Sequence, residues 1–165
     1  MIMKERYCIN ETKIFANEIW CLHCLTPINK LVLKEGYVDK LLFKNELICI
    51  DMDKVEKVNA KDQSRTNLNS SMDSAFLLKN RKVVLVEYRF NYQNLKNLNS
   101  KKLTSKKFYS EQIVLKNKYL VYSDFYYVFS SDVIEQAKRR FRNFNPKLPQ
   151  VYKVIELKDL KSKFF

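Results

Sequence analysis

Two neighbouring apolar segments separated by polar residues form the clearest pattern in the chain. Residues 74–78 (SAFLL) and 83–90 (VVLVEYRF) are apolar and strand-sized, and a polar turn at 79–81 separates them. This arrangement predicts a β-hairpin, with the two strands antiparallel. The same preference for β-forming residues predicts further strands at 46–52, 119–129 and 152–157.

Apolar residues at helical spacing predict three helices. The first covers about residues 10–25, and the second covers 105–115. The third follows Asp132, which has Glu135 at the spacing of a capping box, and it ends before Pro146. Strands and helices that follow one another in this order predict an α/β chain.

The remaining segments are less regular. Residues 31–43 fit either a short hairpin around Gly36 or a mixed segment, whereas the polar stretches 54–72 and 91–105 predict loops. We expect one domain over residues 1–165, with a mixed central β-sheet and flanking helices. The hairpin makes part of this sheet antiparallel, and the later strands are joined through helices.

Charge changes the picture because it is unevenly distributed. The net charge is +13, yet the first 60 residues sum to zero, so the whole excess lies in residues 61–165. Such asymmetry favours a basic face that binds a polyanion, and nucleic acid is the usual one. A solvated basic surface that only keeps the protein soluble is the alternative. The single glycine, Gly36, excludes P-loop and Rossmann nucleotide sites, which need several glycines.

Compartment and cysteine chemistry are the next constraints. No apolar run approaches the roughly 18 residues of a membrane span, and no signal peptide pattern is present, so we expect a cytoplasmic protein without membrane contact. Four cysteines do not make a disulfide scaffold. The spacing of Cys21 and Cys24 suggests zinc, but no second ligand pair matches it, so structural zinc is not expected. We expect buried, inert thiols instead.

The hairpin carries the strongest candidate chemistry. Asp73 precedes its first strand, and Glu87 and Arg89 share one face near the end of the second, because side chains alternate along a strand. A three-residue turn would place Asp73 opposite Glu87, and a two-residue turn would place it opposite Tyr88. Exposed cross-strand ion pairs without a function are the structural alternative.

Glu18 is the other acid that needs an explanation. In a helix over residues 10–25, capped by Asn10, Glu18 falls within the apolar stripe between Phe15 and Leu22. It is either a border residue that reaches solvent or a carboxylate that points into a shared polar site.

Asp73, thirteen intervening residues and then Glu87-Tyr88-Arg89 resemble the motif of the PD-(D/E)XK nuclease superfamily. The resemblance implies a restriction-endonuclease-like fold with an αβββαβ core. It also implies Mg²⁺ bound by Asp73 and Glu87, with Glu18 as a helper, in a hydrolase acting on DNA or RNA phosphodiesters. Arg89 stands where the family has a lysine that positions the attacking water, and Met72 stands where the motif has proline.

Two hypotheses for function follow. The first is a Mg²⁺-dependent nuclease in which Arg89 contacts phosphate. The second is a catalytically degenerate nuclease-fold protein that binds a protein or nucleic-acid partner as an immunity protein, a regulator or a subunit of a defence complex. Basic residues in the last turn of a helix also complement its dipole. The candidate nucleic-acid contacts are Lys106, Lys107, Lys138, Arg139, Arg140 and Arg142.

Overall fold

A computed structural model describes residues 5–91 and 95–165. Its strands are β1 (Leu25–Pro27), β2 (Ile48–Asp51), β3 (Ser74–Leu77), β4 (Val83–Arg89), β5 (Phe125–Phe129) and β6 (Tyr152–Ile155). Its α-helices are α1 (Ile9–Glu18), α2 (Ile28–Lys34), α3 (Met52–Asp62), α4 (Ser100–Lys116), α5 (Ile134–Arg142) and α6 (Leu157–Phe164). Two short 3₁₀ helices are η1 (Leu22–Cys24) and η2 (Leu95–Asn97).

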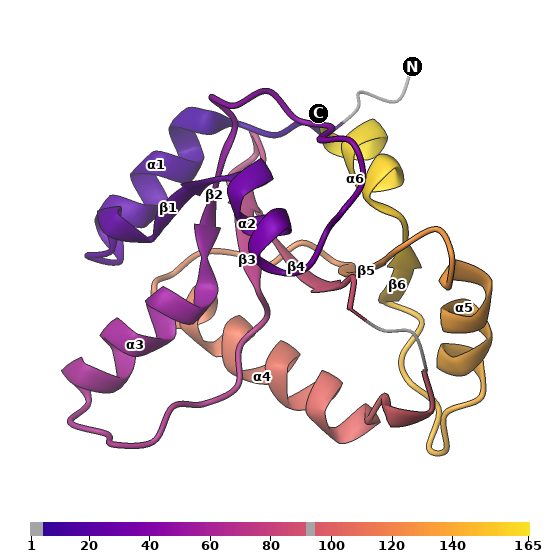
Figure 1. The fold of residues 1–165 in the computed structure, drawn as a ribbon. Helices are drawn as coiled ribbons and strands as arrows, with labels where there is room; N and C mark the ends of the chain where they lie inside the picture. The colour runs from indigo at the N-terminus through magenta and orange to yellow at the C-terminus, as the bar shows by residue number, and fades with distance from the viewer. Residues whose placement is uncertain (1–4, 92–94) are drawn as a thin grey trace.

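The strands of the described residues form one mixed sheet in chain order, β1-β2-β3-β4-β5-β6. Neighbours are antiparallel from β1 to β4, whereas β5 pairs parallel with β4 and β6 parallel with β5. Helices α4 and α5 make the crossovers that parallel pairing requires (Figure 1). The predicted α/β class, with a mixed central sheet and flanking helices, is therefore confirmed.

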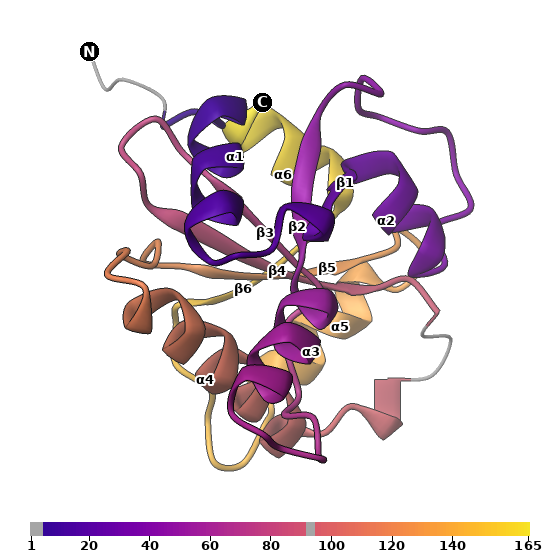
Figure 2. The same ribbon diagram turned by 90° about the vertical axis from the view of Figure 1, so that its left-hand side faces the viewer.

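Both faces of the sheet are covered. Figure 2 shows α2 and α6 on one side of the central strands and α3, α4 and α5 on the other. Strand β4 illustrates the alternation: Val83 and Leu85 belong to the core under α4 and α5, whereas Val84 and Val86 belong to the core under α2 and α6. This double burial explains why the strand is continuously apolar before Glu87. No helix of the described residues has the length and apolar character needed to cross a membrane.

The predicted hairpin is confirmed as β3 and β4, and strands are also present within 46–52, 119–129 and 152–157. The helix expected at 105–115 is longer and starts at Ser100, where Asn99 caps it by accepting bonds from the amides of Lys101 and Lys102. The prediction of a loop over 54–72 is wrong in its first part, because α3 extends to Asp62. Asp51 starts that helix by accepting bonds from the amides of Asp53 and Lys54.

Other boundaries also differ. The first helix ends at Glu18 and not near residue 25, because Trp20 adopts the left-handed conformation with φ of 58°. Asn10 is not its N-cap, a position that Cys8 occupies. Of the two interpretations that residues 31–43 allowed, the hairpin around Gly36 is wrong, because helix α2 ends here and Gly36 follows it at φ of 100°. Asp132 does not cap α5 either, since Val133 stands at that position.

Candidate active site

The hairpin register brings two acidic residues face to face. Ser74 pairs with Val86, and the amide of Leu78 donates to the carbonyl of Lys82, as the three-residue turn requires. Continuing this register places Asp73 opposite Glu87. Both residues are almost fully buried, with 5% of Asp73 and 1% of Glu87 exposed. The alternative of exposed cross-strand ion pairs is therefore wrong for these two acids.

Each of the two carboxylates is held by a defined contact. Oδ2 of Asp73 accepts a hydrogen bond of 2.7 Å from the backbone amide of Tyr88. Oε1 of Glu87 lies 3.0 Å from Nζ of Lys106 on α4 and 3.8 Å from Nε of Arg89. Oε2 of Glu87 is buried and no donor of the described residues reaches it. A proton shared with Asp73 or a bound cation would satisfy that oxygen.

Two further acids, which the sequence patterns did not single out, join Asp73. Carboxylate oxygens of Glu35, Asp53 and Asp73 all lie within 4.8 Å of one another. Glu35 stands at the C-cap of α2 and Asp53 in the first turn of α3, so three separate elements supply the group. The hydroxyl of Ser71 donates to Oδ1 of Asp53 at 2.7 Å and fixes its position. We call Glu35, Asp53, Asp73 and Glu87 the carboxylate cluster.

Asp51 lies near this cluster, but both of its carboxylate oxygens already have other partners. Its Oδ1 caps α3, and its Oδ2 lies 3.4 Å from Nζ of Lys34. The spacing of Asp51 and Asp53 directly after a buried strand is the one sequence signal that could have indicated Asp53. Glu35 has no such signal, because the turn of the chain at Gly36 determines where it lies.

Two residues of the carboxylate cluster, Asp73 and Glu35, have raised pKa values. Burial raises the pKa of Asp73 well above its usual range, and the neighbouring Glu87 carboxylate raises it further. Burial, followed by the charges of Asp73 and Asp53, raises the pKa of Glu35 to about 7. Negative charge is therefore unfavourable here without a compensating cation.

The donor set fits a hard divalent cation. Mg²⁺ binds oxygen ligands at about 2.1 Å, so two ligands on opposite sides of one ion lie about 4.2 Å apart. Oxygens of Glu35, Asp53 and Asp73 all lie within 4.8 Å of one another, which is close to the spacing that ligands of one ion require. Lys106 and Arg89 keep positive charge beside the cluster, where a phosphate group could bind.

Glu18 lies outside this cluster. It is exposed on α1, where it accepts a hydrogen bond from the hydroxyl of Tyr119. Tyr119 also accepts a bond of 2.9 Å from Arg81, which belongs to the turn of the hairpin. Glu18 is thus at the turn end of the hairpin, whereas Asp73 and Glu87 are at its open end. The structure does not bring Glu18 into the predicted site.

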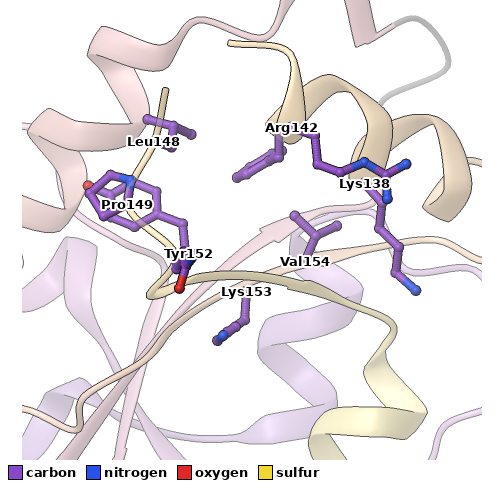
Figure 3. A pocket seen from close by; sticks show the side chains of 9 residues that line it. Lys138, Arg142, Leu148, Pro149, Tyr152, Lys153 and Val154 are labelled. Atoms are coloured by element: carbon purple, nitrogen blue, oxygen red, sulfur yellow. The ribbon is translucent and has the colours of Figure 1, made fainter. Parts of the chain in front are cut away.

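The predicted nucleic-acid contacts divide into three groups. Lys106 lies beside the carboxylate cluster, where it pairs with Glu87, and Lys107 pairs with Glu111 at 2.8 Å. Lys138 and Arg142 line a hollow of about 390 Å³ between α5 and β6, together with Lys153 (Figure 3). Arg139 and Arg140 line a second hollow of about 450 Å³ beside η2.

Arg140 has a structural role as well. It donates a hydrogen bond of 3.2 Å to the carbonyl of Leu98 and lies over the ring of Phe144. Arg140 therefore helps to hold the fold together, whereas Lys138 and Arg142 line the open hollow.

The cysteines do not behave as one class. Cys21 and Cys24 are buried but joined by a disulfide, so the expectation of inert free thiols is wrong for them. Cys49 is a buried free thiol, as expected, and Cys8 is free and partly exposed.

Comparison of the chain with protein-family models, with curated proteins and with solved structures found no match.

Proposed function

We propose that this protein is a metal-dependent nuclease with a restriction-endonuclease-like core of the PD-(D/E)XK type. The observation that carries the proposal is the buried Glu87 opposite Asp73, with an ammonium group 3.0 Å away. The antiparallel neighbours β2, β3 and β4, followed by the crossover helix α4 and the parallel strand β5, also support the αβββαβ order expected for that core, with α3 as an insertion between β2 and β3.

The metal would be held by Asp73 together with Glu35 and Asp53, and Glu87 would offer its second carboxylate oxygen. When bound, a divalent cation supplies a water of lowered pKa and stabilises charge on the phosphodiester. The residues of this chain would do the rest. Ser71 and the amide of Tyr88 hold two of the carboxylates in place.

Lys106 could take the role of the motif lysine, whose place in the sequence is occupied by Arg89. The motif lysine is missing from its usual place, but α4 delivers an ammonium to Glu87 from a different element. Lysine can orient and stabilise an attacking water as a compact donor, whereas the planar guanidinium of Arg89 suits a phosphate clamp. Both cations contact the same oxygen of Glu87, so the two roles can be combined within one site.

The proposal is tested by nucleic-acid cleavage with purified protein. We expect Mg²⁺- or Mn²⁺-dependent cleavage of DNA or RNA, lowered at least about 100-fold by Asp73→Asn or Glu87→Gln, because each removes charge from the metal site. Glu18→Gln is the matched control, since it removes a carboxylate outside the cluster, and it should retain activity. Cleavage that persists in Glu87→Gln would exclude this site.

The binding-module hypothesis remains the second candidate. Arg89 and Lys106 both form ion pairs with Glu87. These pairs neutralise the carboxylate without a metal, which also fits a protein that binds a partner but does not cleave nucleic acid. It predicts no cleavage with any metal and a nucleic-acid or protein complex that survives Asp73→Asn. The same experiment therefore separates the two.

A further inference from the structure

A second group of metal-binding side chains lies on the turn after α1, apart from the carboxylate cluster. The segment Cys21-Leu22-His23-Cys24 forms the 3₁₀ turn η1, closed by a hydrogen bond of 3.0 Å from the amide of Cys24 to the carbonyl of Cys21. This turn brings two sulfurs and an imidazole to one point. The side chains come from four consecutive residues, so local geometry alone assembles them.

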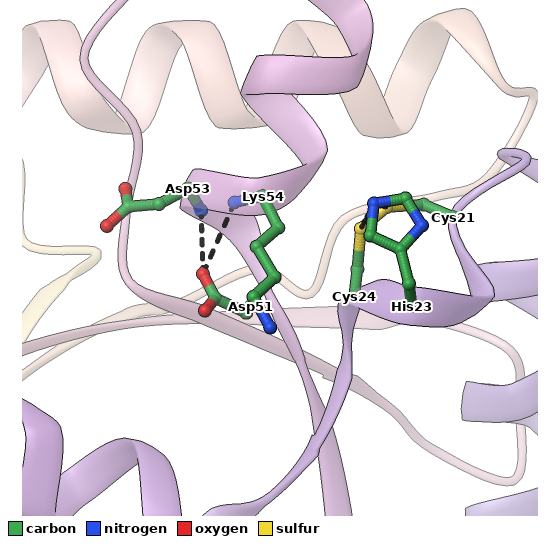
Figure 4. Close-up of a disulfide and its surroundings, with 6 residues drawn as sticks. All are labelled: Cys21, His23, Cys24, Asp51, Asp53 and Lys54. Atoms are coloured by element: carbon green, nitrogen blue, oxygen red, sulfur yellow. Dashed lines mark hydrogen bonds between the residues drawn. A yellow bond between two sulfur atoms is a disulfide. The ribbon is translucent and has the colours of Figure 1, made fainter.

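The ring of His23 faces both sulfurs. Its Nε2 atom lies 3.8 Å from Sγ of Cys21 and 4.0 Å from Sγ of Cys24 (Figure 4). The sulfurs are the only partners of this ring within the part of the chain that the structure describes. The ring is exposed, whereas both cysteines are 0% exposed. Solvent thus reaches the group from the side of His23.

The group has two chemical states. In the structure the sulfurs form a disulfide, which has no thiolate to offer a metal. Two electrons and two protons from a thiol reductant convert it to two thiols, and the reductant becomes a disulfide. The turn then presents two sulfurs and one nitrogen, a donor set that thiophilic cations prefer and Mg²⁺ does not.

We propose that reduced Cys21 and Cys24, together with His23, form a binding site for a thiophilic divalent cation such as Zn²⁺. Each bound ion displaces two thiol protons to solvent, so the two thiolates and the neutral imidazole balance its charge. That balance suits buried sulfurs, because an uncompensated buried charge is costly. Three protein ligands leave the fourth position of a tetrahedral ion open to solvent.

Disulfide and metal exclude each other at this turn, so the site is occupied only under reducing conditions. This behaviour is independent of the carboxylate cluster, since the two groups share no residue.

The test is a Co²⁺ titration of the full-length protein, reduced with a phosphine that is then removed. Co²⁺ bound by thiolates gives a sulfur-to-cobalt charge-transfer absorption that oxygen ligands do not give. We expect this absorption to saturate at one equivalent and to disappear on addition of Zn²⁺. The oxidised protein should give none, and oxidation of the loaded protein should release the metal.

Variants assign the ligands. Cys21→Ser should abolish the charge-transfer band, and His23→Ala should weaken Co²⁺ binding at least about 10-fold, since even outer-shell partners of a metal have that effect. Cys8→Ser is the matched control, because Cys8 is a free cysteine outside this group, and it should give the same charge-transfer band as the wild type. Circular dichroism checks that each variant is folded, and the exposed His23 is the safest position to change.

Three results would overturn the proposal: a folded, reduced wild type without the band, a band unchanged in Cys21→Ser, or equal Co²⁺ affinity in His23→Ala and wild type.

Discussion

The ammonium of Lys106 lies 3.0 Å from the buried Oε1 of Glu87, although the two residues belong to a crossover helix and a central strand. The Lys106 side chain is 23% exposed and that of Glu87 is 2% exposed. The pair therefore joins α4 to β4 at Glu87, a residue of the carboxylate cluster.

Removing the lysine should leave an uncompensated buried charge. We expect Lys106→Met to lower the free energy of unfolding by about 2 kcal/mol or more, less than the full cost of a broken buried pair because Arg89 is nearby. The double variant Lys106→Met, Glu87→Gln should recover part of this loss. Urea denaturation of the two single variants and the double variant measures the coupling.

Lys107→Met is the control for that experiment. Its ion pair with Glu111 is half-buried at the surface of the same helix, and we expect a loss of about 1 kcal/mol or less. Equal losses for Lys106→Met and Lys107→Met would show that Glu87 does not depend on the ammonium.

Glu35 should make the stability of the metal-free protein depend on pH. Its pKa is raised from 4.5 to about 7 in the folded state, so the stability that it contributes is complete below pH 4.5 and lost as the pH rises through about 7. The raised pKa of Asp73 acts in the same direction. Melting temperatures between pH 5 and 8 should fall in wild type and fall less in Glu35→Gln. Parallel curves would contradict the assignment.

A divalent cation should reverse this loss. At pH 7.5, Mg²⁺ or Mn²⁺ at 100 times its dissociation constant should stabilise the wild type by about 2.7 kcal/mol. Asp73→Asn removes one ligand and should show a much smaller shift, whereas Glu18→Gln should respond like the wild type. Calorimetric titration checks the same variants for heat of binding, and identical responses of Asp73→Asn and wild type would exclude the cluster as the metal site.

The open hollow beside β6 should contribute to nucleic-acid binding through charge. In a Glu87→Gln background, Lys138→Ala with Arg142→Ala should weaken binding of duplex DNA and lower the slope of log affinity against log salt by about 2. Fluorescence anisotropy at several salt concentrations gives that slope. The pair Lys158→Ala, Lys161→Ala on α6 removes two cations from the other side of the sheet. An equal change in the two pairs would indicate a general charge effect without a defined contact surface.

The part of the site that follows from the sequence is the part that local pairing controls. The alternation of side chains limited Asp73 to two partners, Glu87 for a three-residue turn and Tyr88 for a two-residue turn, because Asp73 borders the same hairpin; the structure has the three-residue turn. Burial on both faces of β4 could also be anticipated from its continuous apolar run.

The rest depends on contacts between distant segments. Lys106 was assigned to nucleic acid because nothing in its own helix indicates that α4 crosses the end of β4. Helix α3 was missed because its side chains are mostly polar, and its start depends on the cap at Asp51. Glu18 was placed within an apolar stripe that assumed a helix as far as residue 25. The helix ends at Glu18 instead, because Trp20 adopts the left-handed conformation.

The order of strands in the sheet has a consequence for self-association. Its two outer strands are short: β1 covers only Leu25–Pro27 and ends in a proline, and β6 covers Tyr152–Ile155 with an exposed lysine at position 153. Short edges that carry proline or lysine offer few unpaired backbone groups to a neighbouring chain. Edge-to-edge aggregation is therefore disfavoured at both ends of the sheet, and the protein should tolerate the high concentrations that metal titrations require.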